Sequence, residues 1–261
     1  MKKTLALTLL AFSSTSFAVT VPLDLSQPSW TPYSYILGGQ PAGNLALSNA
    51  NQTVTQTVNA DPSLYRNNLN QTNYSMDGTW QVNTIGDDDF IGFVFGYQND
   101  HQYYVMDWKA GTQSYRGTAQ EGFRILKIDA DSRDDLDLYD FWGSNTVTGY
   151  STILTSTYGD IGWAPNTEYD FHLDFRKTTS DIAIKVKHGE LTLWDIVLVD
   201  NTFMSGEFGF YNFSQGRVEY SGFERTGGVP GEVPIPAAAF MFAPALLGFM
   251  GFRRRAKNLA A

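Results

Sequence analysis

Residues 86–109, GDDDFIGFVFGYQNDHQYYVMDWK, join a strongly acidic turn to one of the most apolar runs in the chain. Residues 90–98 are apolar at successive positions, which is typical of a strand covered on both faces of its sheet. Residues 99–101 form a polar hairpin turn, and residues 102–109 return as a second strand. The segment therefore predicts an antiparallel hairpin inside a layered β-structure. Three adjacent carboxylates that repel one another stand directly before it: Asp87, Asp88 and Asp89.

The rest of the central region has the same pattern of short strands separated by polar turns. No segment shows a sustained period of 3.6 residues, which would indicate a helix. We therefore expect an all-β fold, a jelly-roll sandwich of two antiparallel sheets. The further strands are expected at residues 53–58, 74–84, 123–128, 149–158, 168–175, 181–187, 191–199, 207–213 and 217–223.

The N-terminus, MKKTLALTLLAFSSTSFA, has the three parts of a secretory signal peptide. Lys2 and Lys3 give a basic start, residues 5–12 form an apolar core too short to span a bilayer, and residues 16–18 form a small-x-small cleavage site. We expect cleavage after Ala18, at the end of a signal peptide over residues 1–18. The chain has no cysteine, so packing or a bound metal must supply the rigidity of the exported body.

The C-terminus is expected to cross a membrane. Residues 237–252 carry no polar side chain, and with the flanking Val-Pro-Ile-Pro the apolar stretch approaches the roughly 20 residues that span a bilayer. Basic residues, which stay on the cytoplasmic side, follow at once: Arg253, Arg254, Arg255 and Lys257. Residues 226–233 are a linker, and residues 234–261 form a C-terminal signal that contains the transmembrane helix.

This tail resembles the PEP-CTERM sorting signals. The motif at residues 233–239, VPIPAAA, is closest to their VPLPA variant, and an apolar helix and three arginines follow it. The resemblance implies a Gram-negative bacterium and processing by an exosortase-type enzyme. The precursor would be anchored in the inner membrane facing the periplasm, and the mature protein would reach the cell surface or the extracellular space.

The charge of the chain restricts its partners. The net charge is −9 and the isoelectric point is near 4.7, although both ends are basic. The exported body is therefore more acidic than the whole chain, which argues against a nucleic-acid partner. Divalent cations are compatible with such a body.

The central region, residues 19–225, is similar to the C-terminal domain of thrombospondins. The resemblance implies an L-type-lectin-like (concanavalin A-like) jelly roll that binds calcium and belongs to extracellular proteins of adhesion and matrix. The stretches that carry it are residues 56–62 (QTVNADP), 85–98 (IGDDDFIGFVFGYQ), 103–109 (YYVMDWK), 162–163 (GW) and 199–210 (VDNTFMSGEFGF).

The acidic turn is the main candidate metal site, and Ca²⁺ is the expected ion. In an extended segment Asp87 and Asp89 point to one side with Cα atoms about 6.6 Å apart, and a cation would relieve their repulsion. A solvated acidic turn that caps the strand is the alternative, and spacing alone does not separate the two. The resemblance favours calcium. Further oxygen ligands are expected from Asp61 or Asn59, since their turn is also a family match.

Two other acidic features are weaker candidates. Asp107 lies in an apolar strand, where a buried charge needs a partner or an ion, so it is either a metal ligand or a hydrogen-bonded core residue. The acidic loop at residues 129–140 lacks the glycine and the glutamate of an EF-hand, and Arg133 stands at a ligand position. We interpret it as a solvated loop in preference to a second ion site.

Residues 168–175, EYDFHLDF, are the one enzyme-like motif. Alternation places Glu168, Asp170, His172 and Asp174 on one face and the aromatic residues on the other. Glu168 and Asp170 satisfy the separation of about 5 Å that a retaining glycosidase needs. Glu168 and Asp174 are about 20 Å apart in a regular strand, and the glycosidase spacing Glu-x-Asp-x-x-Glu is absent. We therefore favour a polar solvent face over an aromatic core.

The expected function is that of a non-enzymatic, calcium-stabilised binding module. Its expected partners are a surface polysaccharide or an extracellular matrix protein, the exosortase-type enzyme, and the inner membrane before processing. Two alternatives stay open: a carbohydrate-active enzyme that uses Glu168 and Asp170, and a sugar-binding lectin.

Overall fold

The computed structural model describes residues 21–115, 117–143, 149–177 and 180–226. The predicted signal peptide and sorting signal lie outside these residues. Within them, no helix is long and apolar enough to cross a membrane. The last strand ends at Thr226, one residue beyond the predicted end of the domain.

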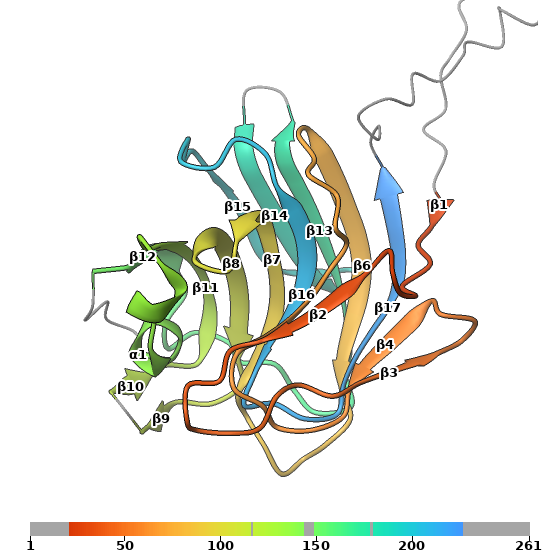
Figure 1. The fold of residues 1–261 in the computed structure, drawn as a ribbon. Coiled ribbons are helices and arrows are strands. Elements are labelled where there is room, and N and C mark those ends of the chain that lie inside the picture. The colour runs from red at the N-terminus through yellow and green to blue at the C-terminus, as the bar shows by residue number, and fades with distance from the viewer. Residues whose placement is uncertain (1–20, 116, 144–148, 178–179, 227–261) are drawn as a thin grey trace, which may run out of the picture. The chain divides into compact units, whose positions relative to one another are not determined.

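Two antiparallel sheets make up the described domain, as predicted (Figure 1). The order of the seven-stranded sheet is β12 (Ser151–Ser156), β11 (Gly122–Asp129), β8 (Gln102–Lys109), β7 (Phe90–Asn99), β16 (Glu207–Phe213), β5 (Ser63–Arg66) and β2 (Thr31–Ser34). The order of the eight-stranded sheet is β15 (Leu191–Leu198), β14 (Ser180–His188), β13 (Glu168–Lys177), β6 (Tyr74–Val82), β17 (Val218–Thr226), β4 (Thr53–Gln56) and β3 (Leu45–Ser48), with β1 (Val21–Pro22) paired to β17. Strands β2, β3 and β5 were not predicted from the sequence.

The main core lies between the two sheets and is largely aromatic. Trp80 of β6 stacks on Phe171 of β13 with ring centroids 4.8 Å apart, and Phe93 of β7 lies 4.9 Å from Phe171. Burial of such large rings is the main stabilising contribution in a domain that has no disulfide.

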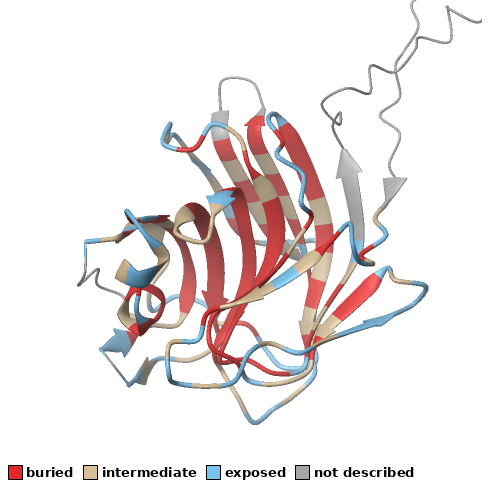
Figure 2. Cartoon of the chain, in the orientation of Figure 1, coloured by how far each residue is buried: buried red, intermediate tan, exposed pale blue. Residues whose placement is uncertain are grey.

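A second buried cluster covers the other face of the seven-stranded sheet. Val94 of β7 and Val105 of β8 pack there with Leu138 and Phe141 of the short helix α1 (Leu138–Trp142). Strands β7 and β8 are therefore buried on both faces, and Figure 2 shows them red along most of their length. The prediction made from residues 86–109 is confirmed.

The outer face of the eight-stranded sheet is polar. Along β13, Glu168 and Asp170 are exposed, whereas Tyr169 and Phe171 are buried. Burial along β6, β13 and β14 therefore alternates, in contrast to β7 and β8 (Figure 2). This confirms the interpretation of residues 168–175 as a polar face over an aromatic core.

One ion pair on this polar face predicts a pH dependence of stability. His172 Nδ1 lies 2.6 Å from Asp77 Oδ1, and this hydrogen bond raises the pKa of His172 although partial burial opposes it. A histidine whose folded pKa exceeds its unfolded value of about 6.5 stabilises the fold below that pH, and the contribution disappears as the pH rises through the folded pKa. When the pH is raised from about 6 to about 8.5, we expect the free energy of unfolding to fall less in His172→Gln than in the wild type. Urea unfolding at both pH values measures the difference. Equal losses in both proteins would contradict the expectation.

The acidic loop between β11 and β12 uses its carboxylates as caps. Asp135 accepts hydrogen bonds from the Ser132 backbone N–H and hydroxyl at the start of a 3₁₀ turn, η1 (Arg133–Asp135). Asp137 accepts from the Tyr139 N–H and caps α1, while Asp140 accepts from the Asp137 N–H. Such reciprocal caps stabilise short helices without an ion. The helix itself, which covers the sheet beside the site, was not predicted.

Candidate functional site: an acidic turn and the pocket beside it

The acidic turn leads into β7. One carboxylate oxygen from each of Asp87, Asp88 and Asp89 lies within 4.8 Å of the others, so the structure brings the three predicted residues together. Asp87 and Asp88 are partly exposed, and Asp89 is buried. Cations favour such a convergence of oxygen atoms.

Main-chain contacts fix the position of Asp89. Its N–H donates to Gln215 Oε1 at 2.9 Å, and its carbonyl accepts from Trp163 Nε1 at 2.9 Å. Trp163 belongs to the Gly-Trp stretch that carried part of the family resemblance. That stretch therefore has a role in the structure, which is to hold the start of β7.

A buried lysine already neutralises part of the acidic turn. Lys109, the last residue of β8, is 0% exposed and pairs in register with Phe90. Its Nζ lies 2.8 Å from Asp89 Oδ1 and 3.6 Å from Asp88 Oδ1, and it also donates to Gln113 Oε1 at 2.8 Å. Burial raises the pKa of Asp89, and the Lys109 ammonium opposes that effect. The sequence analysis missed Lys109, although strand alternation places it on the same face as Asp107.

The Asn59 side chain lies beside the acidic turn. Its side-chain Nδ2 donates to Asp87 Oδ2. Two glycines let the backbone approach these side chains closely. A Cβ at Gly111 would lie 2.6 Å from Asp88 Oδ2, and a Cβ at Gly216 would lie 2.7 Å from Asn59 Oδ1. Either methyl group would displace an oxygen of the turn.

Asp61 lies outside the three-carboxylate cluster. It is buried, and it accepts hydrogen bonds from the backbone N–H groups of Leu37 at 2.8 Å, Gly39 at 3.3 Å and Gln40 at 2.8 Å. These bonds hold the loop before β3 in place. The observed role of Asp61 is therefore to organise this loop beside the pocket described below.

Asp107 has a protein partner. Arg124 of β11 faces it in register and donates from Nε at 2.7 Å and from Nη2 at 2.9 Å. Burial alone would lower the pKa of Arg124, but the Asp107 carboxylate outweighs burial and raises it. Each carboxylate oxygen accepts one bond of this fork, so Arg124 supplies the partner that a buried aspartate needs.

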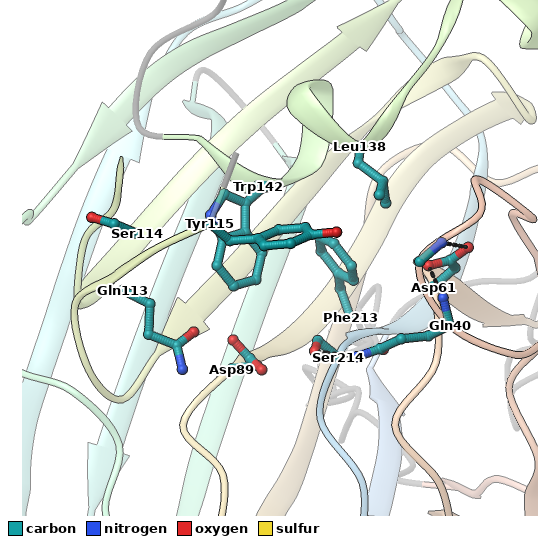
Figure 3. Close-up of a pocket in the computed structure, with 11 residues that line it drawn as sticks. Gln40, Asp61, Asp89, Gln113, Ser114, Tyr115, Leu138, Trp142, Phe213 and Ser214 are labelled. Carbon is teal, nitrogen blue, oxygen red and sulfur yellow. Dashed lines mark hydrogen bonds between the residues drawn. The ribbon is translucent and has the colours of Figure 1, made fainter. Parts of the chain in front are cut away.

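A pocket of about 500 Å³ opens beside the acidic turn, and Asp89 lines it (Figure 3). Segments distant in sequence build its walls, including the loop before β3, the β9 (Gln113–Ser114) and β10 (Thr118–Ala119) hairpin, α1 and the end of β16. Figure 3 shows Gln113 and Ser114 on one side of it, and Gln40 and Asp61 on the other. The lining residues are Gly39, Gln40, Asp61, Asp89, Gln113, Ser114, Tyr115, Leu138, Trp142, Phe213 and Ser214.

The two-sheet fold, with a pocket at its loops, is a lectin-like, all-β sandwich. The family model for the thrombospondin C-terminal region matches residues 40–226. The chain belongs to this family, as its acidic turn and the strands after it predicted.

Curated relatives agree with the family assignment. The chain is 30% identical over 186 residues to thrombospondin-3b of Danio rerio, covering 68% of this chain and 20% of that protein. It is 31% identical over 186 residues to thrombospondin-2 of Gallus gallus, with coverage of 68% and 16%. It is 29% identical over 180 residues to cartilage oligomeric matrix protein of Bos taurus, with coverage of 66% and 24%. The chain thus spans less than a quarter of each of these relatives.

Solved structures share the fold at low identity. The exoplasmic/lumenal domain of VIP36 in its Ca²⁺/Man-bound form is 12% identical, with a TM-score of 0.52 and coverage of 80% of this chain and 87% of that one. Its Ca²⁺/Man2-bound form is 11% identical, with a TM-score of 0.50 and coverage of 79% and 84%. These likenesses confirm the lectin-like jelly roll.

Proposed function

We propose that this chain is an exported, calcium-binding module that attaches to a surface polysaccharide or an extracellular matrix protein. The observation that carries the proposal is the convergence of three carboxylates at the acidic turn of a thrombospondin C-terminal domain. The matched fold also occurs in a protein solved with Ca²⁺ and mannose, and one relative is named as a cartilage matrix protein. Binding at the loops of a rigid sandwich is compatible with such a role.

The side chains of the turn suit calcium on its exposed side. Ca²⁺ takes six to eight oxygen ligands at about 2.3–2.6 Å, and it accepts carboxylates, amide oxygens and water. Asp87 and Asp88 offer partly exposed carboxylates, and a rotated Asn59 amide would offer its oxygen in place of its nitrogen. The Lys109 ammonium repels a cation from the inner side. We therefore assign Asp87, Asp88 and Asn59 as calcium ligands. Asp89 would contact both the ion and the Lys109 ammonium.

We expect Ca²⁺ to raise the melting temperature of the chain and a chelator to reverse the rise. At a hundredfold excess over Kd the ion would add about 2.7 kcal/mol, which is roughly 5–10 °C for a domain of this size. The double variant Asp87→Asn, Asp88→Asn should lose the rise, whereas Asp170→Asn, on the exposed face of β13, should keep it. Melting in the presence of Ca²⁺ or a chelator checks this. An equal rise in the double variant would disprove the assignment.

The two ends of the chain extend the proposal to sorting. The signal peptide would direct export, and residues 234–261 would hold the precursor in the inner membrane until an exosortase-type enzyme removes the tail.

We propose that the mature domain binds a ligand and does not catalyse a reaction. Glu168 and Asp170 lie on an exposed sheet face and do not line the pocket.

A further inference from the structure

The floor of the pocket is a chain of linked polar groups in which the Lys109 ammonium balances the Asp89 carboxylate. Lys109 Nζ donates to Asp89 Oδ1 at 2.8 Å, Ser214 lowers the pKa of the Asp89 carboxyl, which burial raises, and Gln40 Nε2 donates to Ser214 Oγ at 2.8 Å. Three backbone N–H groups donate to the carboxylate of Asp61, a second acidic residue of the pocket. An anionic ligand therefore finds no excess of positive charge here.

One atom of this floor lacks a partner. Gln40 Oε1 is buried and makes no hydrogen bond within the described part of the chain. The bond network supports this orientation of the amide. The Gln40 amide nitrogen donates to the Ser214 oxygen, which leaves the single hydroxyl hydrogen of Ser214 for another acceptor such as the Asp89 carboxylate. A buried acceptor without a donor is unfavourable, and a ligand hydroxyl that reached it would supply the missing hydrogen bond.

Aromatic side chains form the apolar part of the pocket. Trp142 and Phe213 are buried, whereas Tyr115 is 62% exposed. The Tyr115 and Trp142 ring centroids are 5.6 Å apart, with planes at 78° (Figure 3). The pocket thus places the exposed aromatic ring of Tyr115 beside a polar floor that contains the acceptor Gln40 Oε1.

We infer that this pocket binds one residue of a neutral saccharide. A sugar ring has a face of C–H groups that stacks on an aromatic ring, and a rim of hydroxyls that donate hydrogen bonds. Its C–H face would lie on Tyr115, and one hydroxyl would donate to Gln40 Oε1. The volume of about 500 Å³ falls in the range of small-ligand sites. The inference rests on the proposed binding function and names the ligand class and the residues that recognise it.

The test is a titration of the full chain, with calorimetry as the readout. The neutral probes are the methyl glycosides of mannose, glucose and galactose, together with N-acetylglucosamine, and the anionic comparator is glucuronic acid. We expect a neutral probe to bind and glucuronic acid to bind more weakly. Tyr115→Ala should weaken binding at least tenfold, or about 1.4 kcal/mol, while Tyr115→Phe should keep it within about threefold.

Two further variants locate the site. Gln40→Met removes the unpaired acceptor at similar volume and should also weaken binding. Leu191→Ala on β15 removes an apolar side chain that is 62% exposed, as Tyr115 is, and should change nothing. Binding that survives both Tyr115→Ala and Gln40→Met would place the saccharide elsewhere, and tighter binding of glucuronic acid than of any neutral probe would contradict the inference.

No binding of any neutral probe would also overturn the inference, and the calcium-dependent melting of the same samples would then still test the proposed calcium site. Conversely, saccharide binding without any calcium effect on melting would overturn the calcium assignment and leave the inference intact.

Discussion

Replacing Arg124 with methionine is expected to lower the free energy of unfolding by about 3–5 kcal/mol, the usual cost of leaving one partner of a buried ion pair. Arg124 and Asp107 are both fully enclosed by the second core cluster and the sheet. Arg124 also donates to the carbonyls of Phe141 and Gly143 at the end of α1. The variant therefore leaves a carboxylate and two carbonyls short of a donor. Urea unfolding measures the loss.

A double variant separates the charge from the packing. Arg124→Met combined with Asp107→Leu removes both charges, and we expect it to recover much of the stability lost by the single change. Arg124→Lys keeps the charge but loses the two-pronged hydrogen bond, so an intermediate loss is expected. If the double variant lost as much stability as the two single variants added together, the two residues would act independently, and the ion pair would not be the cause of the loss.

Replacing Lys109 with methionine is expected to cause a loss of similar size, about 3–5 kcal/mol near neutral pH, because Asp89 would be buried without its ammonium partner. The loss should depend on pH. Burial raises the pKa of Asp89 above its unfolded value of about 3.9, so without Lys109 the folded state favours the protonated acid. The variant should therefore regain stability as the pH falls from about 7 toward 4.

The matched control is the pair Lys109→Met, Asp89→Asn, which leaves a neutral amide in place of the buried charge. It should be more stable than Lys109→Met alone at pH 7, and its stability should vary less with pH. Unfolding curves at several pH values check both statements. A Lys109→Met protein as stable as the wild type would show that the ion pair contributes nothing to folding.

The layered fold was predictable because burial leaves a pattern in each strand. Residues 90–98 are apolar at successive positions, which indicated a sheet covered on both sides, and β13 alternates, which indicated a sheet with one open face. The short strands β2, β3 and β5 leave a weaker pattern, since four residues carry too few alternations. Their existence depends on pairing with neighbours that are distant in the chain.

The candidate site was predictable only in part. Asp87, Asp88 and Asp89 are adjacent, so their convergence follows from local geometry. The partner of Asp107 depends on the register between β8 and β11, because this register places Arg124 opposite Asp107. The whole sheet sets that register, so the sequence of either strand alone does not reveal it. Lys109 was missed because a lysine at a strand end is usually solvated. The pocket was missed because its walls come from segments between residues 39 and 214 that meet only after folding.

The walls of the pocket come from separate connections between strands, and none of them is part of the aromatic core between the two sheets. Substitutions in the hairpin of β9 and β10 or in the loop before β3 can therefore alter what is bound while the sandwich keeps its stability. Related domains are expected to diversify their ligands at these connections and to keep the same sandwich beneath them.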